Sequence, residues 1–98
     1  MTGTVLIVDD VATNRIVLKV KLSAACYDTL QAETGREALA LARRTLPDAI
    51  LLDVMLPDLS GIEVCRALKA DPATRDIPVV MITTSRDGAA RGAAGGGR

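Results

Sequence analysis

Three short apolar runs, rich in β-branched residues and separated by segments with helical patterning, most constrain the fold of this chain. The runs are TVLIV (residues 4–8), DAILL (48–52) and PVVMIT (78–83). A continuous apolar run of this length is typical of a strand buried on both faces, as in a parallel sheet. A fourth run, YDTLQA (27–32), is more polar and indicates an edge strand.

Helical signals lie between these runs. Thr34 with Glu37, and Ser60 with Glu63, match the S/T-x-x-E capping box that begins a helix. A further helix is expected over roughly residues 13–25. Regular alternation of strand and helix predicts parallel strands with right-handed crossovers. We therefore expect an α/β fold, a doubly wound parallel sheet with helices on both faces.

Size and composition narrow the class of protein. At 98 residues the chain is at most one domain, and without tryptophan or phenylalanine its core must be aliphatic. Lysine plus arginine equals aspartate plus glutamate, which disfavours nucleic-acid binding. No apolar stretch approaches the ~20 residues of a membrane helix, and MTGTVLIVDD lacks the marks of a signal peptide. We expect a cytoplasmic protein with no membrane contact, in which Cys26 and Cys65 are buried, reduced thiols.

Polar residues follow the strands at the points where each ends. Asp9 and Asp10 follow the first run, Asp53 follows the third run along the chain, and Thr83 with Thr84 ends the fourth. The carboxyl ends of parallel strands meet at one edge of the sheet, so we expect these side chains to share a crevice. In LLDVMLPDLSG (residues 51–61), the apolar run delivers Asp53 to that edge, and the proline and glycine then turn the chain away.

Three carboxylates at one edge repel each other unless a cation lies between them, and oxygen ligands favour Mg²⁺. A carboxylate beside Mg²⁺ can attack phosphorus and form an acyl phosphate, while the Thr83 hydroxyl would contact the phosphoryl oxygens. The alternative is that Asp9 and Asp10 only cap a helix. The positions of Asp53 and Thr83 at the matching strand ends favour the metal site.

The stretches VLIVDD, DAILLDVMLPDLSG and IPVVMIT together resemble the response-regulator receiver domain of two-component signalling, over residues 4 to about 84. VCRALKADPATRDIPVVMIT is most similar to the receivers of diguanylate cyclase regulators of the PleD type. The resemblance implies a flavodoxin-like receiver fold. It also implies that Asp53 is the phosphoacceptor, that Asp9 and Asp10 bind Mg²⁺ with Asp53 and the Met55 backbone carbonyl, and that Thr83 moves toward the phosphoryl group.

The resemblance assigns three further positions. Pro57 and Gly61 match the loop that shapes the site. Thr84 stands where a small residue is usual, so its bulk is expected to slow phosphoryl entry or hydrolysis.

The sequence departs from the family at its carboxyl end. Receivers carry a lysine at the end of a fifth strand, followed by a fifth helix, but no lysine follows Lys69 here. Residues 85–98, SRDGAARGAAGGGR, have no bulky apolar side chain, and their arginines are not equivalents of that lysine. We expect an incomplete receiver domain over residues 1–84, without the fifth strand and helix, and a disordered Gly/Ala/Arg-rich tail over 85–98. A truncated chain or a shifted reading frame would also give such a tail.

The helix over residues 13–25 has two apolar flanks. One contains Ile16, Val17, Val20 and Ala24, and the other contains Leu18, Leu22 and Ala25. Only one flank can face the sheet, and without the fifth unit the fourth strand leaves an open edge. We therefore expect a homodimer or larger assembly.

The function expected from these features is a phosphoacceptor module that takes a phosphoryl group from a histidine kinase or phosphotransfer protein onto Asp53. It is not expected to be an enzyme, and at most it would hydrolyse its own acyl phosphate slowly. The alternative is a degenerate receiver that is not phosphorylated and serves as a dimerisation or interaction module. An aspartyl phosphatase is disfavoured, because Met55 stands where such enzymes usually have a second acid.

Overall fold

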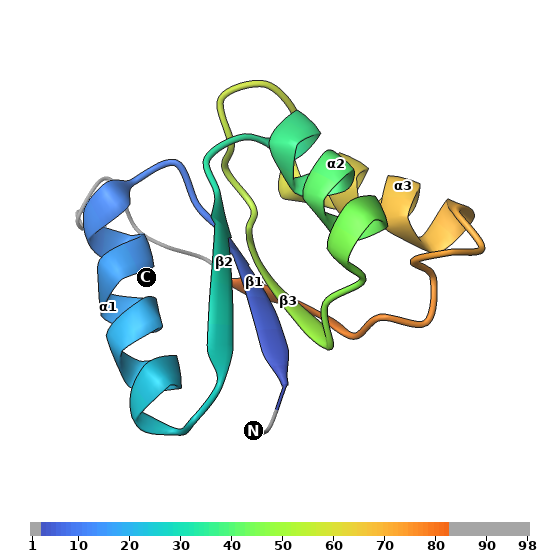
Figure 1. The fold of residues 1–98 in the computed structure, drawn as a ribbon. Helices are drawn as coiled ribbons and strands as arrows, with labels where there is room; N and C mark the ends of the chain where they lie inside the picture. Colours follow the sequence, from blue (N-terminus) through green and yellow to red (C-terminus); the bar gives the residue numbers. More distant parts are fainter. Residues whose placement is uncertain (1–2, 83–98) are drawn as a thin grey trace, which may run out of the picture.

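The computed structural model describes residues 3–82, which form a four-stranded parallel sheet between two layers of helices (Figure 1). The strands are β1 (Thr4–Val8), β2 (Asp28–Ala32), β3 (Ala49–Asp53) and β4 (Val79–Ile82). The helices are α1 (Ala12–Ala24), α2 (Gly35–Thr45) and α3 (Gly61–Ala70). The strand order is β2-β1-β3-β4, and every neighbouring pair is parallel. The predicted α/β class is confirmed, and β2 is an edge strand as expected.

The sheet separates α1 from the other two helices. Helix α1 lies against one face, and α2 and α3 lie side by side against the other (Figure 1). Because both faces are covered, Leu6 and Ile7 of β1 and Ile50 and Leu52 of β3 are fully buried. The core is aliphatic, as the shortage of aromatic residues required.

Helices α2 and α3 begin at the predicted residues. At α3 the box is complete: the Ser60 hydroxyl accepts from the Glu63 N–H, and the Glu63 carboxylate accepts from the Ser60 N–H. At α2 the Thr34 hydroxyl accepts from the Glu37 N–H, but the Glu37 carboxylate accepts from Glu33 rather than from Thr34. The return bond has therefore moved one residue toward the amino terminus, to the N–H of the residue before the N-cap.

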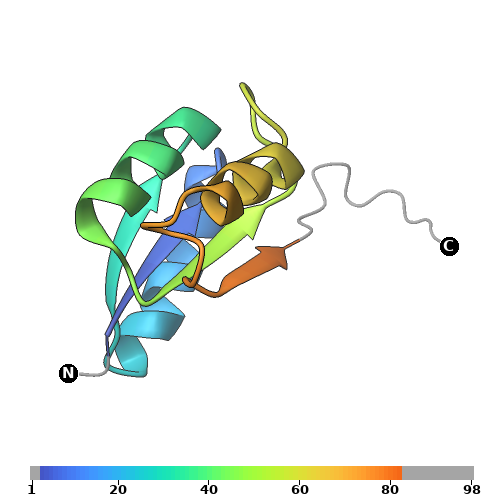
Figure 2. The same ribbon diagram turned by 90° about the vertical axis from the view of Figure 1, so that its right-hand side faces the viewer.

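Strand β4 differs from its prediction. The run over residues 78–83 predicted a strand buried on both faces, but Val80 and Met81 are 51% and 38% exposed. In the described part of the chain β4 has one neighbouring strand, β3, and it lies at the edge of the sheet (Figure 2), which agrees with the separate expectation of an open edge at the fourth strand. The apolar run therefore predicted the strand correctly but did not predict how far its side chains are buried.

Helix α1 contacts β1 and β2 with one of its two apolar flanks. Leu18 and Leu22 are half-buried, whereas Ile16, Val17 and Val20 are 57%, 47% and 62% exposed. No residue of Ala12–Ala24 is fully buried. The expectation that one flank faces the sheet and the other faces outward is confirmed.

The two cysteines differ in burial. Cys26, predicted to be buried, is exposed, because it lies in the turn after α1 with a left-handed φ of 70°. Cys65 is half-buried against the core.

No helix within residues 3–82 is long and apolar enough to cross a membrane. The predicted absence of a fifth strand and helix, and the predicted disordered tail, concern residues 83–98 and lie outside the described residues.

Candidate functional site

The site forms where the strand order reverses, at the carboxyl ends of β1 and β3. Val8 and Leu52 are paired in the sheet, so Asp9 and Asp53, which directly follow them, end neighbouring strands. The chain leaves β1 toward β2 on one side and later returns through β3 to β4 on the other. Open parallel sheets bind ligands at such a reversal, beyond the carboxyl ends of the strands.

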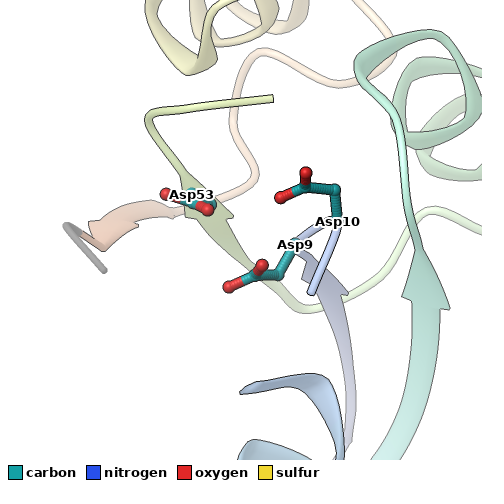
Figure 3. A group of neighbouring side chains, drawn as sticks. All are labelled: Asp9, Asp10 and Asp53. Carbon is teal, nitrogen blue, oxygen red and sulfur yellow. The ribbon is translucent and has the colours of Figure 1, made fainter. Parts of the chain in front are cut away.

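Three carboxylates converge there, from Asp9, Asp10 and Asp53 (Figure 3). One oxygen from each lies within 4.8 Å of the others. Asp9 is 2% and Asp53 1% exposed, and Asp10 is half-buried. Buried carboxylates are costly without a compensating charge, and a triangle of oxygen donors suits a hard divalent cation such as Mg²⁺. The residues present therefore fit the ion that the sequence predicted.

Hydrogen bonds fix the orientation of Asp9. Its Oδ1 accepts from the Val11 N–H at 2.8 Å, and its Oδ2 accepts from Asn14 Nδ2 at 3.2 Å. Burial raises the pKa of Asp9, and the charges of Asp53 and Asp10 raise it further, against the lowering effect of the two hydrogen bonds. The alternative that Asp9 and Asp10 only cap a helix is met in part. Asp9 accepts a hydrogen bond from the Val11 N–H, but the N-cap residue of α1 is Val11, whose side chain makes no cap bond.

The segment after β3 folds back onto Asp53. The Met55 N–H donates to Asp53 Oδ1 at 3.2 Å, which places the Met55 backbone beside the carboxylate while its side chain is exposed. The Gly61 N–H donates to the Val54 carbonyl at 2.7 Å. A Cβ at Gly61 would lie 2.5 Å from the Asp53 carbonyl oxygen, so the close approach of α3 to the end of β3 requires glycine. Pro57 is exposed in the same segment.

Two residues of α1 complete the surroundings of Asp9, and neither was predicted from the sequence. Asn14 holds the carboxylate, as described above. Arg15 donates to the Asp9 carbonyl at 2.6 Å and to Gln31 Oε1 at 3.1 Å, with only 11% of its side chain exposed. It therefore joins the ends of β1 and β2, and its guanidinium also lies 3.9 Å from Glu33 Oε2. The available signal was that two adjacent polar residues, Asn14 and Arg15, lie in the first turn of the predicted helix, close to Asp9 and Asp10 in the sequence.

The end of β4 lies next to the end of β3, where the Val54 N–H donates to the Ile82 carbonyl at 3.3 Å. Ile82 also lines an apolar depression of about 190 Å³ with Asn14, Val17 and Leu18 of α1. Thr83, the predicted phosphoryl contact, and Thr84 follow Ile82 in the sequence and lie outside the described residues. The roles of Met55 and Thr83 stay predictions.

Comparison with known proteins agrees with this geometry. The response regulator receiver domain family matches residues 5–95, which extends beyond the predicted domain end at residue 84. The response regulator PleD of Caulobacter vibrioides (strain NA1000 / CB15N) is 53% identical over 83 residues, or 85% of this chain. The chain spans only 18% of the length of PleD. The predicted likeness to receivers of the PleD type is confirmed.

Solved structures show the same fold. The N-terminal domain of a response regulator receiver protein from Methanoculleus marisnigri JR1 superposes with a TM-score of 0.83 at 39% identity, covering 87% of this chain and 69% of that one. The receiver domain of sensor histidine kinase PA1611 from Pseudomonas aeruginosa PAO1, with a magnesium ion in its active site cleft, gives 0.81 at 29% identity, covering 89% and 70%. Fold, carboxylate geometry and family match together show that this chain belongs to the response regulator receiver domain family.

Proposed function

We propose that this receiver domain accepts a phosphoryl group on Asp53, with Mg²⁺ held by Asp9, Asp10, Asp53 and the Met55 backbone carbonyl. The observation that carries the proposal is the convergence of three carboxylates at one sheet edge, two of them almost fully buried. The magnesium in the active site cleft of the related PA1611 receiver supports the choice of metal. The phosphoryl donor is a phosphohistidine on a histidine kinase or phosphotransfer protein.

The transfer is a substitution at phosphorus. An oxygen of Asp53 forms a bond to phosphorus while the N–P bond of the phosphohistidine breaks, and its electron pair stays on the imidazole nitrogen. Mg²⁺ supplies neutralisation of the charge on the phosphoryl oxygens. The bond from the Met55 N–H holds Asp53 in place, and Asp9 and Asp10 provide the remaining carboxylate ligands. We assign to the Thr83 hydroxyl a hydrogen bond to a phosphoryl oxygen.

The role proposed is that of an acceptor rather than of an enzyme with turnover. The chain contains no histidine, so it has no phosphohistidine with which to pass the group on. Because histidine kinases present their phosphohistidine inside the cell, we also propose that the domain acts in the cytoplasm.

The experiment is intact-mass measurement after incubation with acetyl phosphate and Mg²⁺. A gain of one phosphoryl group is expected for the wild type and not for Asp53→Ala. Asp28→Ala, which removes an exposed carboxylate at the start of β2, is the control and should be modified like the wild type. A folded wild-type protein that gains no mass would refute the acceptor function.

A second candidate function is assembly, favoured by the exposed apolar flank of α1. Ile16, Val17 and Val20 point outward, and the depression lined by Val17 and Ile82 links this flank to the exposed strand β4. Residues 85–98 supply no apolar side chain larger than alanine to cover it. We propose that a second copy of the chain covers this surface in a homodimer, either beside phosphorylation or, in a degenerate receiver, instead of it.

A further inference from the structure

Asp58 joins two parts of the chain that are distant in sequence. It lies in the segment between β3 and α3, and its carboxylate accepts three backbone hydrogen bonds. Oδ1 accepts from the N–H groups of Gly35 and Leu59, each at 2.8 Å, and Oδ2 accepts from Arg36 at 3.0 Å. Gly35 and Arg36 are the first residues of α2, 23 and 22 positions away. Asp58 therefore ties the loop after the acceptor strand to the start of another helix.

The amino-terminal end of α2 is a favourable place for the Asp58 carboxylate. The first N–H groups of a helix have no partner within the helix, and the positive end of the helix dipole favours a carboxylate there. Burial raises the pKa of Asp58, but hydrogen bonds from Gly35, Arg36 and Leu59 more than offset this and leave the pKa below its ordinary value. The Arg36 side chain is mostly exposed and 3.9 Å away, so it adds little.

Packing beside Asp58 leaves the loop little room. A Cβ at Gly35 would lie 2.9 Å from Leu59 Cβ and 2.8 Å from Val64 Cγ2, so α2 begins in close contact with the loop and with α3. Nearer to β3, the same loop is held by the bond between Met55 and Asp53. Met55 and Asp58 are therefore two of the points at which this loop is fixed, one at the acceptor carboxylate and one at α2, and the Gly61–Val54 bond is a third.

We propose that Asp58 is a positioning residue for the metal site. By holding the loop against α2, Asp58 maintains the hydrogen bond from the Met55 N–H to Asp53. It thereby keeps the Met55 carbonyl close to the three carboxylates. Asp58 does not itself contact the metal. The inference rests on the proposed function, because it requires Mg²⁺ to bind at Asp9, Asp10 and Asp53.

Asp71 offers a matched control. Its carboxylate also accepts from a backbone N–H, that of Ala73 at 2.9 Å, and from Arg43 Nε at 2.8 Å. Its side chain is 24% exposed, as is that of Asp58. It lies, however, at the far end of α3 from the site. Replacing Asp71 therefore removes a comparable set of hydrogen bonds without touching the loop that carries Met55.

The test measures the Mg²⁺ dissociation constant by titration calorimetry for the full chain and for Asp58→Ala, Asp58→Asn and Asp71→Ala. Asp58→Ala is expected to weaken Mg²⁺ binding at least about tenfold, the scale for residues that orient metal ligands. Asp58→Asn keeps one acceptor oxygen and should lose less, and it carries the test if the alanine variant does not fold. Asp71→Ala should bind Mg²⁺ like the wild type. Hydrogen exchange at the Met55 amide should be faster in both Asp58 variants and unchanged in Asp71→Ala.

The outcomes separate the two proposals. A wild type that binds Mg²⁺ while Asp58→Ala and Asp58→Asn bind it equally well would overturn the positioning role alone. Equal weakening by Asp71→Ala would also overturn it, because the effect would then be one of general stability. A folded wild type that binds no Mg²⁺ would refute the proposed function and, with it, this inference.

Discussion

Asp9 and Asp53 end two paired strands, one residue beyond the partners Val8 and Leu52, and both are almost completely buried. Each carboxylate is therefore held where its charge is poorly hydrated and opposed by the other. Such a pair is unfavourable for the fold by itself and becomes favourable when a cation lies between the oxygens. The geometry that we propose for metal binding is therefore expected to lower the stability of the metal-free domain.

Asp9→Asn should stabilise the metal-free protein, because it removes a buried charge while keeping a similar shape. We expect the free energy of unfolding in urea to rise by about 0.5 to 2 kcal/mol without Mg²⁺, the usual range for a single stabilising substitution. With Mg²⁺ at 100 times its dissociation constant, the wild type should gain about 2.7 kcal/mol and the variant almost nothing. Asp28→Asn is the control and should respond to Mg²⁺ like the wild type. If Asp9→Asn unfolded more easily than the wild type without Mg²⁺, the result would contradict the proposed repulsion between the buried carboxylates.

The convergence of Asp9, Asp10 and Asp53 could be predicted from the sequence because it depends only on strand ends and on parallel topology. Once the apolar runs are assigned to neighbouring parallel strands, the residues that follow them must meet. The contacts of Asp58 and Arg15 could not be predicted in this way. They depend on how a loop or a helix lies against an element more than fifteen residues away, and hydrophobic periodicity carries no such information.

Burial was less predictable than secondary structure. The apolar run of β4 predicted a strand correctly, but whether Val80 and Met81 are covered depends on which elements lie beside them. Cys26 was misjudged for a related reason: its apolar neighbours in the sequence belong to the end of α1, where the chain turns in a left-handed conformation and leaves the side chain in solvent.

Acid should remove part of the stability contributed by Asp58 and Asp71. Hydrogen bonds from the Ala73 N–H and from Arg43 lower the pKa of Asp71, and backbone hydrogen bonds leave the pKa of Asp58 lowered as well. A carboxyl with a lowered pKa stabilises the fold fully above its ordinary value, 3.8, and loses this effect as the pH falls through the lowered value.

The measurement is the melting temperature of the wild type and of Asp58→Asn/Asp71→Asn as the pH falls from neutral. The wild type should melt higher at neutral pH, and the difference should shrink and close in acid, where each protonated carboxyl resembles the amide. The raised pKa of Asp9 acts in the opposite sense in both proteins and cancels from the difference. A difference that stays constant down to strongly acidic pH would contradict the assignment.

Gly61→Ala should destabilise the protein although alanine normally favours a helix over glycine. The added Cβ would meet the Asp53 carbonyl oxygen and the Val54 Cα, which are backbone atoms and cannot move without shifting the end of β3. A loss of about 1 to 3 kcal/mol in urea unfolding is expected, together with weaker Mg²⁺ binding. Gly35→Ala occupies the equivalent position of α2 and meets side-chain atoms of Leu59 and Val64 at 2.8 to 2.9 Å rather than backbone atoms at 2.5 to 2.8 Å, so its loss should be smaller. Equal losses would show that the backbone contact is not decisive.

Val20→Asp should separate the proposed homodimer without unfolding the domain. Val20 is 62% exposed on the outer flank of α1, so a charge there costs the monomer little, whereas in a dimer it would lose its hydration against an apolar partner. Light scattering at tens of micromolar should give the mass of a dimer for the wild type and of a monomer for Val20→Asp. Ile62→Asp is the matched control, because Ile62 is 52% exposed but lies on α3, on the opposite face of the sheet. It should remain a dimer. A monomeric wild type would refute the assembly, and dissociation by Ile62→Asp alone would move the interface to the face of α3.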